Sequence, residues 1–143
     1  MLLKDFGGEF AFINQIIPHI INEDVLVGIG DDAAVFKLGN ERIVVTTDTI
    51  VEGDHFSLNY FTYYQIGIKA IESSASDLVA MGASPKYVFI SLCLPASIEV
   101  EPLRELYRGM QSACSRIGAI ILGGDTTHNQ NIIISATFIG SFK

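Results

Sequence analysis

Five aspartates in this sequence stand at positions where strands, helices or turns are expected to meet. They are Asp31 and Asp32 in GIGDDAA, Asp48 in TTDT, Asp77 in SASDLVAMG and Asp125 in GGDTT. Each one alone could be an ordinary turn residue or a surface charge, because Asp is common in turns. Together they could supply the hard oxygen ligands of a divalent cation that binds phosphate.

If these carboxylates converge, their repulsion must be relieved. Two unit charges about 4 Å apart repel by ~4 kcal/mol at an effective dielectric constant of about 20. A cluster of four therefore needs protons or cations, and Mg²⁺ suits it because Mg²⁺ takes carboxylate, water and phosphate oxygens. No EF-hand spacing favours Ca²⁺. Zn²⁺ is disfavoured because the histidines have no ligand spacing with each other or with the cysteines; these histidines are His19, His55 and His128.

Asp48 has hydroxyl neighbours. It stands near the end of an expected strand over residues 42–49 and shares a face with Thr46, whereas Thr47 points to the other face. A bend at the end of the strand could still bring the Thr47 hydroxyl or carbonyl to the same place.

Asp77 and Asp125 have small neighbours. A helix over residues 63–81 places Asp77 on a stripe of small side chains that includes Ser74. Close packing on this stripe would keep the carboxylate from being loosely solvated. Asp125 follows two glycines, whose missing side chains allow a ligand to approach the backbone.

The hydrophobic pattern predicts the elements that must position these residues. Helical spacing predicts helices over residues 9–21, 63–81 and 99–117, with Pro18 ending or kinking the first. Strands are predicted over residues 25–29, 33–38, 42–49, 87–94, 119–122 and 132–139, with a Gly39-Asn40 turn between the second and third. This order predicts an α+β fold with a mixed sheet of four to six strands and helices on one face. The other face also looks apolar, so we expect it to be covered.

The composition is that of one folded domain. The 143 residues are 49% hydrophobic and 17% charged, which excludes disorder. A net charge of −7 excludes a basic nucleic-acid groove and a polybasic membrane patch, and no apolar run approaches the ~20 residues of a membrane span. The two cysteines form no CxxC pattern, and Lys4 and Asp5 interrupt the apolar N-terminus. We therefore expect a cytoplasmic protein without a nucleic-acid or membrane partner.

Several common catalytic motifs are missing from the sequence. It contains no P-loop pattern GxxxxGK[ST], no GxGxxG and no GxSxG. Cys93 lies in an apolar strand pattern, where inert cysteines are more common than nucleophiles. Metal-assisted chemistry at carboxylates is therefore the interpretation that the residues favour.

Four segments together resemble the thiamine-monophosphate kinase family. They are GIGDDAAVF, VVTTDTIVEGDHF, SASDLVAMGASP and GGDTT, and the resemblance spans about residues 9–140. It implies a fold similar to the N-terminal domain of aminoimidazole ribonucleotide synthetase, with two such domains face to face in a homodimer so that their sheets close into a barrel. The implied activity is transfer of the terminal phosphoryl group of ATP to thiamine monophosphate, giving thiamine diphosphate.

The resemblance also implies roles for individual residues. Mg²⁺ ligands are expected at Asp32, Thr46, Thr47, Asp48, Asp77 and Asp125. ATP contacts are expected at Gly124, Asp125 and Tyr107, and a thiamine monophosphate contact at His55.

This sequence departs from the family pattern in its length and at two sites. Family chains are about twice as long, so we expect residues 1–143 to be a single N-terminal domain for ATP and Mg²⁺ binding and dimerisation, inactive without the second domain. His128-Asn129 replaces a common arginine and glycine, and Asp54 occupies a position that is often apolar. Two alternatives remain open: a superfamily enzyme that uses ATP on another small molecule, and a non-catalytic nucleotide-binding and dimerisation module.

Overall fold

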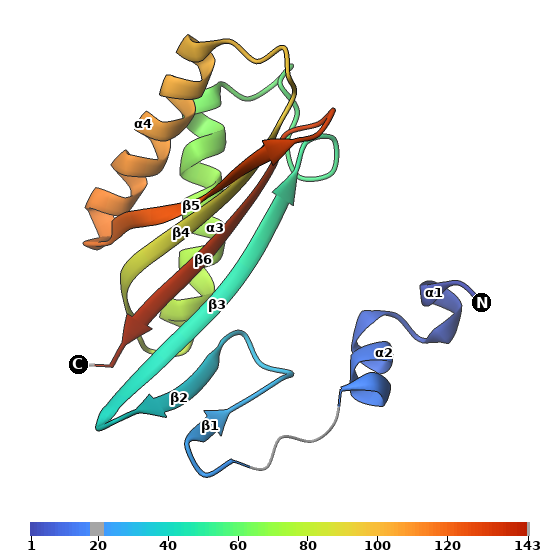
Figure 1. Cartoon of the computed structure of the whole chain (residues 1–143), viewed down its shortest axis with the longest axis vertical. Coiled ribbons are helices and arrows are strands. Elements are labelled where there is room, and N and C mark those ends of the chain that lie inside the picture. The colour runs from blue at the N-terminus through green and yellow to red at the C-terminus, as the bar shows by residue number, and fades with distance from the viewer. Residues whose placement is uncertain (18–21, 143) are drawn as a thin grey trace.

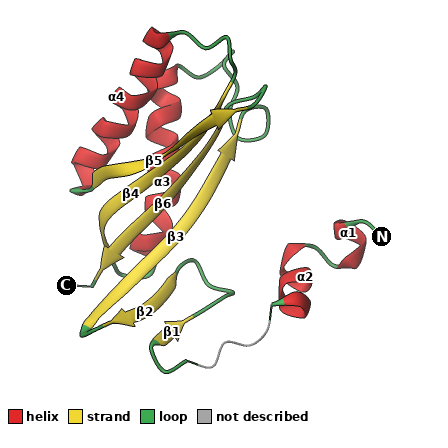
Figure 2. Ribbon diagram, in the orientation of Figure 1, coloured by secondary structure: helices red, strands yellow, loops and turns green. Residues whose placement is uncertain are grey.

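The computed structural model describes residues 1–17 and 22–142, and its main feature is one mixed sheet with two long helices on one of its faces (Figure 1). The strands are β1 (Val25–Val27), β2 (Ala34–Leu38), β3 (Glu41–Val51), β4 (Ser84–Leu94), β5 (Ile120–His128) and β6 (Ile133–Ser141). The helices are α1 (Leu3–Phe6), α2 (Glu9–Ile16), α3 (Tyr63–Ala80) and α4 (Val100–Ile117). The predicted α+β class is confirmed, with a six-stranded sheet and with α3 and α4 side by side on the same face (Figure 2).

The strand order is β1-β2-β3-β6-β4-β5. The predicted turn at Gly39 and Asn40 joins β2 to β3, whose first pair is Leu38 and Glu41. β6 pairs antiparallel with both β3 and β4, whereas β5 is parallel to β4 and is reached through α4. This topology places segments distant in sequence, β3 and β6 above all, side by side.

The hydrophobic core lies between the sheet and the two long helices. Alternate residues of the central strands face the helices and are buried: Val44, Ile50, Val88, Ile90, Leu92, Ile134, Ala136 and Phe138. α3 and α4 cross closely at Gly67 and Gly109. A Cβ atom on Gly109 would overlap the carbonyl oxygen of Tyr64, and one on Gly67 would overlap that of Leu106.

The start of α3 is held by a capping box. The Gln65 N–H donates to the Thr62 hydroxyl at 3.1 Å, and the Thr62 N–H donates to the Gln65 side-chain carbonyl at 2.9 Å. This capping box fixes the residue at which α3 begins, and Asp77 lies near the other end of the helix.

Several elements differ from the sequence prediction by a few residues, and three of the differences are larger. α1 was not predicted, and α2 ends at Ile16 with Ile17 in extended backbone, as expected for a residue before proline. The remainder of the predicted helix, with Pro18 and His19, lies outside the described residues. β5 continues to His128 rather than ending at residue 122, because its backbone keeps pairing with β4 along the whole of GGDTTH.

The sheet face away from α3 and α4 is apolar in some rows and polar in others. One row across β3, β6, β4 and β5 is apolar: Val45, Ile139, Tyr87 and Ile120. A second row, four residues further along β3 and β4, is polar: Thr49, Ser135, Ser91 and Asp125. Tyr87 and Ile120 are 43% and 58% exposed, so the apolar row is accessible to solvent in a single copy. We call the whole sheet face away from α3 and α4 the open face.

No helix in the described ranges 1–17 and 22–142 is long and apolar enough to cross a membrane.

Candidate functional site

Asp48 and Asp77 lie on the helix side of the sheet. Asp48 is flanked on its face by the buried Thr46 and Ile50, and Asp77 is half-buried on α3 above it. Partial burial raises the pKa of Asp77, and the nearby charges of Asp48 and then Asp32 raise it further. The structure therefore brings the Asp77 carboxylate into electrostatic range of both Asp48 and Asp32.

The Asp31-Asp32 loop is tied to β3 by the Thr46 hydroxyl. Thr46 is 6% exposed, and its Oγ1 donates to the Asp32 carbonyl oxygen at 3.1 Å. The Asp32 N–H donates to the Asp31 carboxylate at 2.8 Å, which shapes the loop locally. A cavity of about 380 Å³ opens beside this loop, with Asp31, Thr46 and Thr47 among its lining residues.

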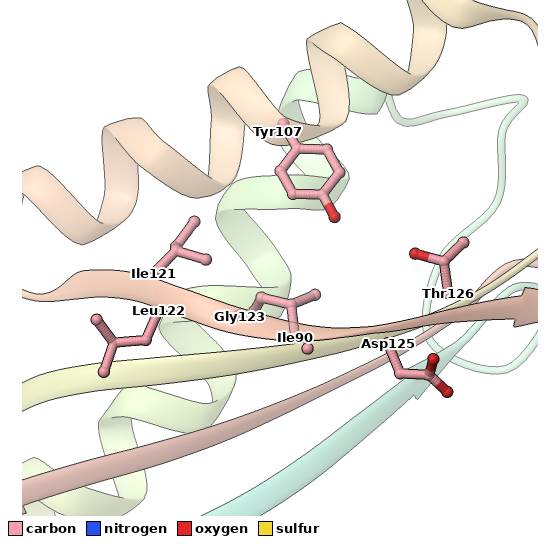
Figure 3. A pocket seen from close by; sticks show the side chains of 8 residues that line it. Ile90, Tyr107, Ile121, Leu122, Gly123, Asp125 and Thr126 are labelled. Carbon is pink, nitrogen blue, oxygen red and sulfur yellow. The ribbon is translucent and has the colours of Figure 1, made fainter.

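Thr47 and Asp125 lie on the open face instead. The Thr137 hydroxyl on β6 donates to the Thr47 hydroxyl at 2.9 Å. Asp125 pairs with Ser91, the exposed residue between the buried Ile90 and Leu92, and Figure 3 shows its carboxylate on the side of β5 away from Tyr107.

The six expected metal ligands are thus divided between the two faces of the sheet. Asp32, Thr46, Asp48 and Asp77 are on the helix side, and Thr47 and Asp125 are on the open face. Across residues 1–17 and 22–142, no three or more His, Cys, Asp and Glu side chains are grouped closely enough to hold a metal ion. The one pocket expected for all four carboxylates is therefore not formed within a single copy. Mg²⁺ is usually held by only one or two carboxylates together with water and phosphate oxygens, so the carboxylates of Asp48 and Asp77 on the helix side still fit a hard divalent cation.

The three residues expected to contact ATP line one cavity. It has a volume of about 440 Å³ and lies between α4 and the edge strand β5 (Figure 3). Tyr107 on α4 and Gly124 and Asp125 on β5 line it, together with Ile90, Ile121, Leu122, Gly123 and Thr126. The Asp125 carboxylate itself points away from Tyr107 (Figure 3). Burial raises the pKa of Tyr107, so its phenol is protonated at neutral pH and can donate a hydrogen bond.

The packing of two strands requires glycine at position 124, in addition to the ligand contact that is expected there. Its φ is +153°, and a Cβ atom there would overlap the carbonyl group of Ile90 on the neighbouring strand. The close approach of β5 to β4 therefore requires glycine at this position.

His55 lies in the turn that follows β3. Its Nδ1 accepts a hydrogen bond from the Val51 N–H at 2.9 Å, so the neutral ring carries its proton on Nε2. The ring is exposed, while the adjacent Phe56 is buried and anchors the turn. His55 can consequently offer an N–H donor to a ligand. Asp54 and His128, where the sequence departs from the family pattern, are both exposed.

Sequence reasoning missed two polar residues near these sites. Thr126 lines the cavity beside Tyr107, and Thr137 orients the Thr47 hydroxyl. Extending the predicted strand through GGDTTH would have identified Thr126, because alternation puts it on the helix side. No local pattern pointed to Thr137, since its partner lies 90 residues earlier.

Comparison with known proteins places the chain among close relatives. The thiamine-monophosphate kinase of Bacillus subtilis (strain 168) is 37% identical over 139 residues, which cover 94% of this chain and 42% of the relative. That of Corynebacterium glutamicum is 42% identical over 136 residues, which cover 93% and 40%. A solved structure of AaThiL complexed with AMPPCP and TMP has a TM-score of 0.86 and 34% identity over 98% of this chain and 43% of that one.

These matches confirm the resemblance that the four sequence segments predicted, and the chain spans about two fifths of the length of the curated relatives. A family model described as AIR synthase related protein, N-terminal domain, matches residues 30–142. The matched part contains five of the strands, both long helices and every residue of the candidate site. The chain belongs to the family of AIR synthase related proteins and carries their N-terminal domain.

Proposed function

We propose that this chain is the nucleotide- and metal-binding part of a kinase that transfers the terminal phosphoryl group of ATP to thiamine monophosphate, giving thiamine diphosphate and ADP. The observation that carries the proposal is the cavity that unites Tyr107, Gly124 and Asp125, in a chain similar along 98% of its length to a protein whose structure was solved in complex with AMPPCP and TMP. The proposed domain is the whole of residues 1–143.

This phosphoryl transfer requires the protein to position the two substrates and to neutralise the charge on their phosphate groups. The acceptor is a phosphate that is already ionised near neutral pH, so no general base is needed. Asp32, Thr46, Asp48 and Asp77 would hold Mg²⁺ on the helix side, and Thr47 and Asp125 would supply oxygens on the open face. When bound, Mg²⁺ would neutralise charge on the phosphate oxygens.

The proposed role of His55 is to bind the phosphate of thiamine monophosphate. Its Nδ1 is occupied by the Val51 N–H, which leaves Nε2–H free to donate. The turn is held by backbone hydrogen bonds from Asp54 and His55 to the Val51 carbonyl oxygen, and a donor held in this way can orient an acceptor phosphate without taking a proton from it.

We also propose a homodimer formed through the open face. Its apolar row exposes Tyr87 and Ile120, and a second copy would cover these side chains. Light scattering on the purified chain tests the dimer, and a monomer at tens of micromolar concentration would contradict it.

The proposed location is the cytoplasm, which agrees with two free cysteines, Cys93 and the buried Cys114.

A direct assay tests the activity. An enzyme that carries this domain is incubated with Mg²⁺, ATP and thiamine monophosphate, and thiamine diphosphate is separated by chromatography, with AMPPCP in place of ATP as the control. Because the chain spans 42% of a relative's length, the second candidate is a nucleotide-binding and dimerisation module without turnover. Calorimetry distinguishes the two: heat on adding Mg-ATP without product supports the module. No heat and no product would contradict both.

A panel of other phosphate acceptors tests the third possibility, a different small-molecule substrate.

A further inference from the structure

One serine of α3 is fully buried and joins the helix to the sheet. Ser74 is 0% exposed, and its Oγ donates to the carbonyl oxygen of Ala136 on β6 at 2.9 Å. In the described ranges, no other side chain of α3 forms a hydrogen bond to the sheet. This bond is therefore the one directional contact between α3 and the strands.

The bond lies beside the place where the two carboxylates approach. Ala136 is the residue paired with Asp48 across β3 and β6, and Asp77 follows Ser74 by three residues, one turn further along the same face of α3. A shift of α3 along the sheet would move Asp77 relative to Asp48, and the Ser74 bond opposes that shift.

Apolar packing alone does not resist sliding in the same way. Leu78 packs against Gly140 on β6, where a Cβ atom would overlap its side chain. Such contacts are non-directional, whereas a hydrogen bond weakens steeply as its angle and length depart from the optimum. The charges of Asp48 and Asp32 repel the Asp77 carboxylate, so α3 needs a fixed attachment near this point if it is to keep Asp77 in place before a cation binds.

We propose that Ser74 is a positioning residue, which fixes α3 on β6 and so holds the Asp77 carboxylate beside Asp48. The inference deepens the proposed function, since it concerns two of the proposed metal ligands. Supporting groups behind a metal site typically change its affinity by about 10- to 100-fold when they are removed.

The test is a Mn²⁺ titration of the 143-residue chain, followed by electron paramagnetic resonance. We expect Ser74→Ala to weaken Mn²⁺ binding by about 10-fold or more, and Ser74→Thr, which restores a hydroxyl, to recover most of that loss. Ser76→Ala is the matched control, because it removes a similar bond from Oγ to the Ser73 carbonyl within α3. Ile134→Val, which trims the core on β6 without removing a hydrogen bond, controls for reduced stability. Both controls should stay within about two-fold of the parent.

Mn²⁺ affinity of Ser74→Ala within two-fold of the parent, or a loss equal to that of Ile134→Val, would overturn the proposal. If the parent itself binds no Mn²⁺, the proposed metal site fails, and crystal structures of the metal-free parent and Ser74→Ala decide the positioning role. A displacement of the Asp77 Cα relative to Asp48 by more than about 0.5 Å supports that role. An unchanged position of Asp77 overturns it.

Discussion

The close crossing of α3 and α4 gives a sharp prediction for Gly109→Ala. A Cβ atom at residue 109 would overlap the Tyr64 carbonyl oxygen, far inside the roughly 3.5 Å of an ordinary contact. α4 must then move away from α3, and such overpacking typically costs about 2–3 kcal/mol. Alanine gains about 1 kcal/mol over glycine from helix propensity. The net expectation is a loss of about 1–2 kcal/mol in the free energy of unfolding.

Thermal unfolding followed by circular dichroism measures this loss. For a domain of this size, the expected fall in Tm is about 3–6 °C. Gln111→Ala, at an exposed position of the same helix, serves as the control and should unfold close to the parent. The sign decides the reasoning: if Gly109→Ala raises Tm, helix propensity is the dominant effect and the helices do not cross as closely as the structure has them. Because Tyr107 lies two residues earlier on α4, the same variant should also weaken Mg-ATP binding.

Three further predictions concern the candidate site. Burial and the charges of Asp48 and Asp32 raise the pKa of Asp77, so the folded metal-free chain binds this proton more tightly than the unfolded chain. The stability due to this group is therefore present at low pH and is lost as pH rises through the folded pKa. Asp77→Asn should therefore unfold at a higher urea concentration than the metal-free parent at pH 7, and the difference should shrink at pH 4; an equal or lower midpoint at pH 7 would assign Asp77 a structural role. In an enzyme that carries this domain and turns over, Asp48→Asn should lower kcat by at least about 100-fold, and near-normal kcat at saturating Mg²⁺ would refute the shared-metal interpretation. His55→Ala should raise KM for thiamine monophosphate by about 10-fold or more, through loss of one hydrogen bond to a charged group, with KM for ATP unchanged; an unchanged KM for thiamine monophosphate removes the role of His55.

Elements with a strong periodic pattern could be predicted from the sequence. α3, β3 and the hairpin at Gly39-Asn40 follow from alternation, helical spacing and turn residues. The end of β5 could not, because GGDTTH contains glycines and polar residues that are typical of a loop. Its extended form depends on pairing with β4, which is a contact between segments that lie far apart along the chain.

The candidate site shows the same limit. Residue types identified the aspartates, Tyr107 and His55, and the cavity that unites Tyr107 with Gly124 agrees with the roles expected from the resemblance. The convergence of all four carboxylates in one copy did not follow. Asp125 lies in a strand whose register with Ser91 turns its side chain to the open face, and a shift of one residue would have turned it to the other.

The sequence by itself determined the chemistry available to this protein: oxygen ligands without a P-loop or a zinc pattern, a short set of expected elements, and a family resemblance carried by four segments. Only the tertiary structure decided which of those oxygens share a face, because the faces depend on strand register and on helix placement. The hydrogen bond from Ser74 to Ala136 joins residues that are 62 positions apart. No local pattern encodes such a contact, since it exists only when the helix has packed on the sheet.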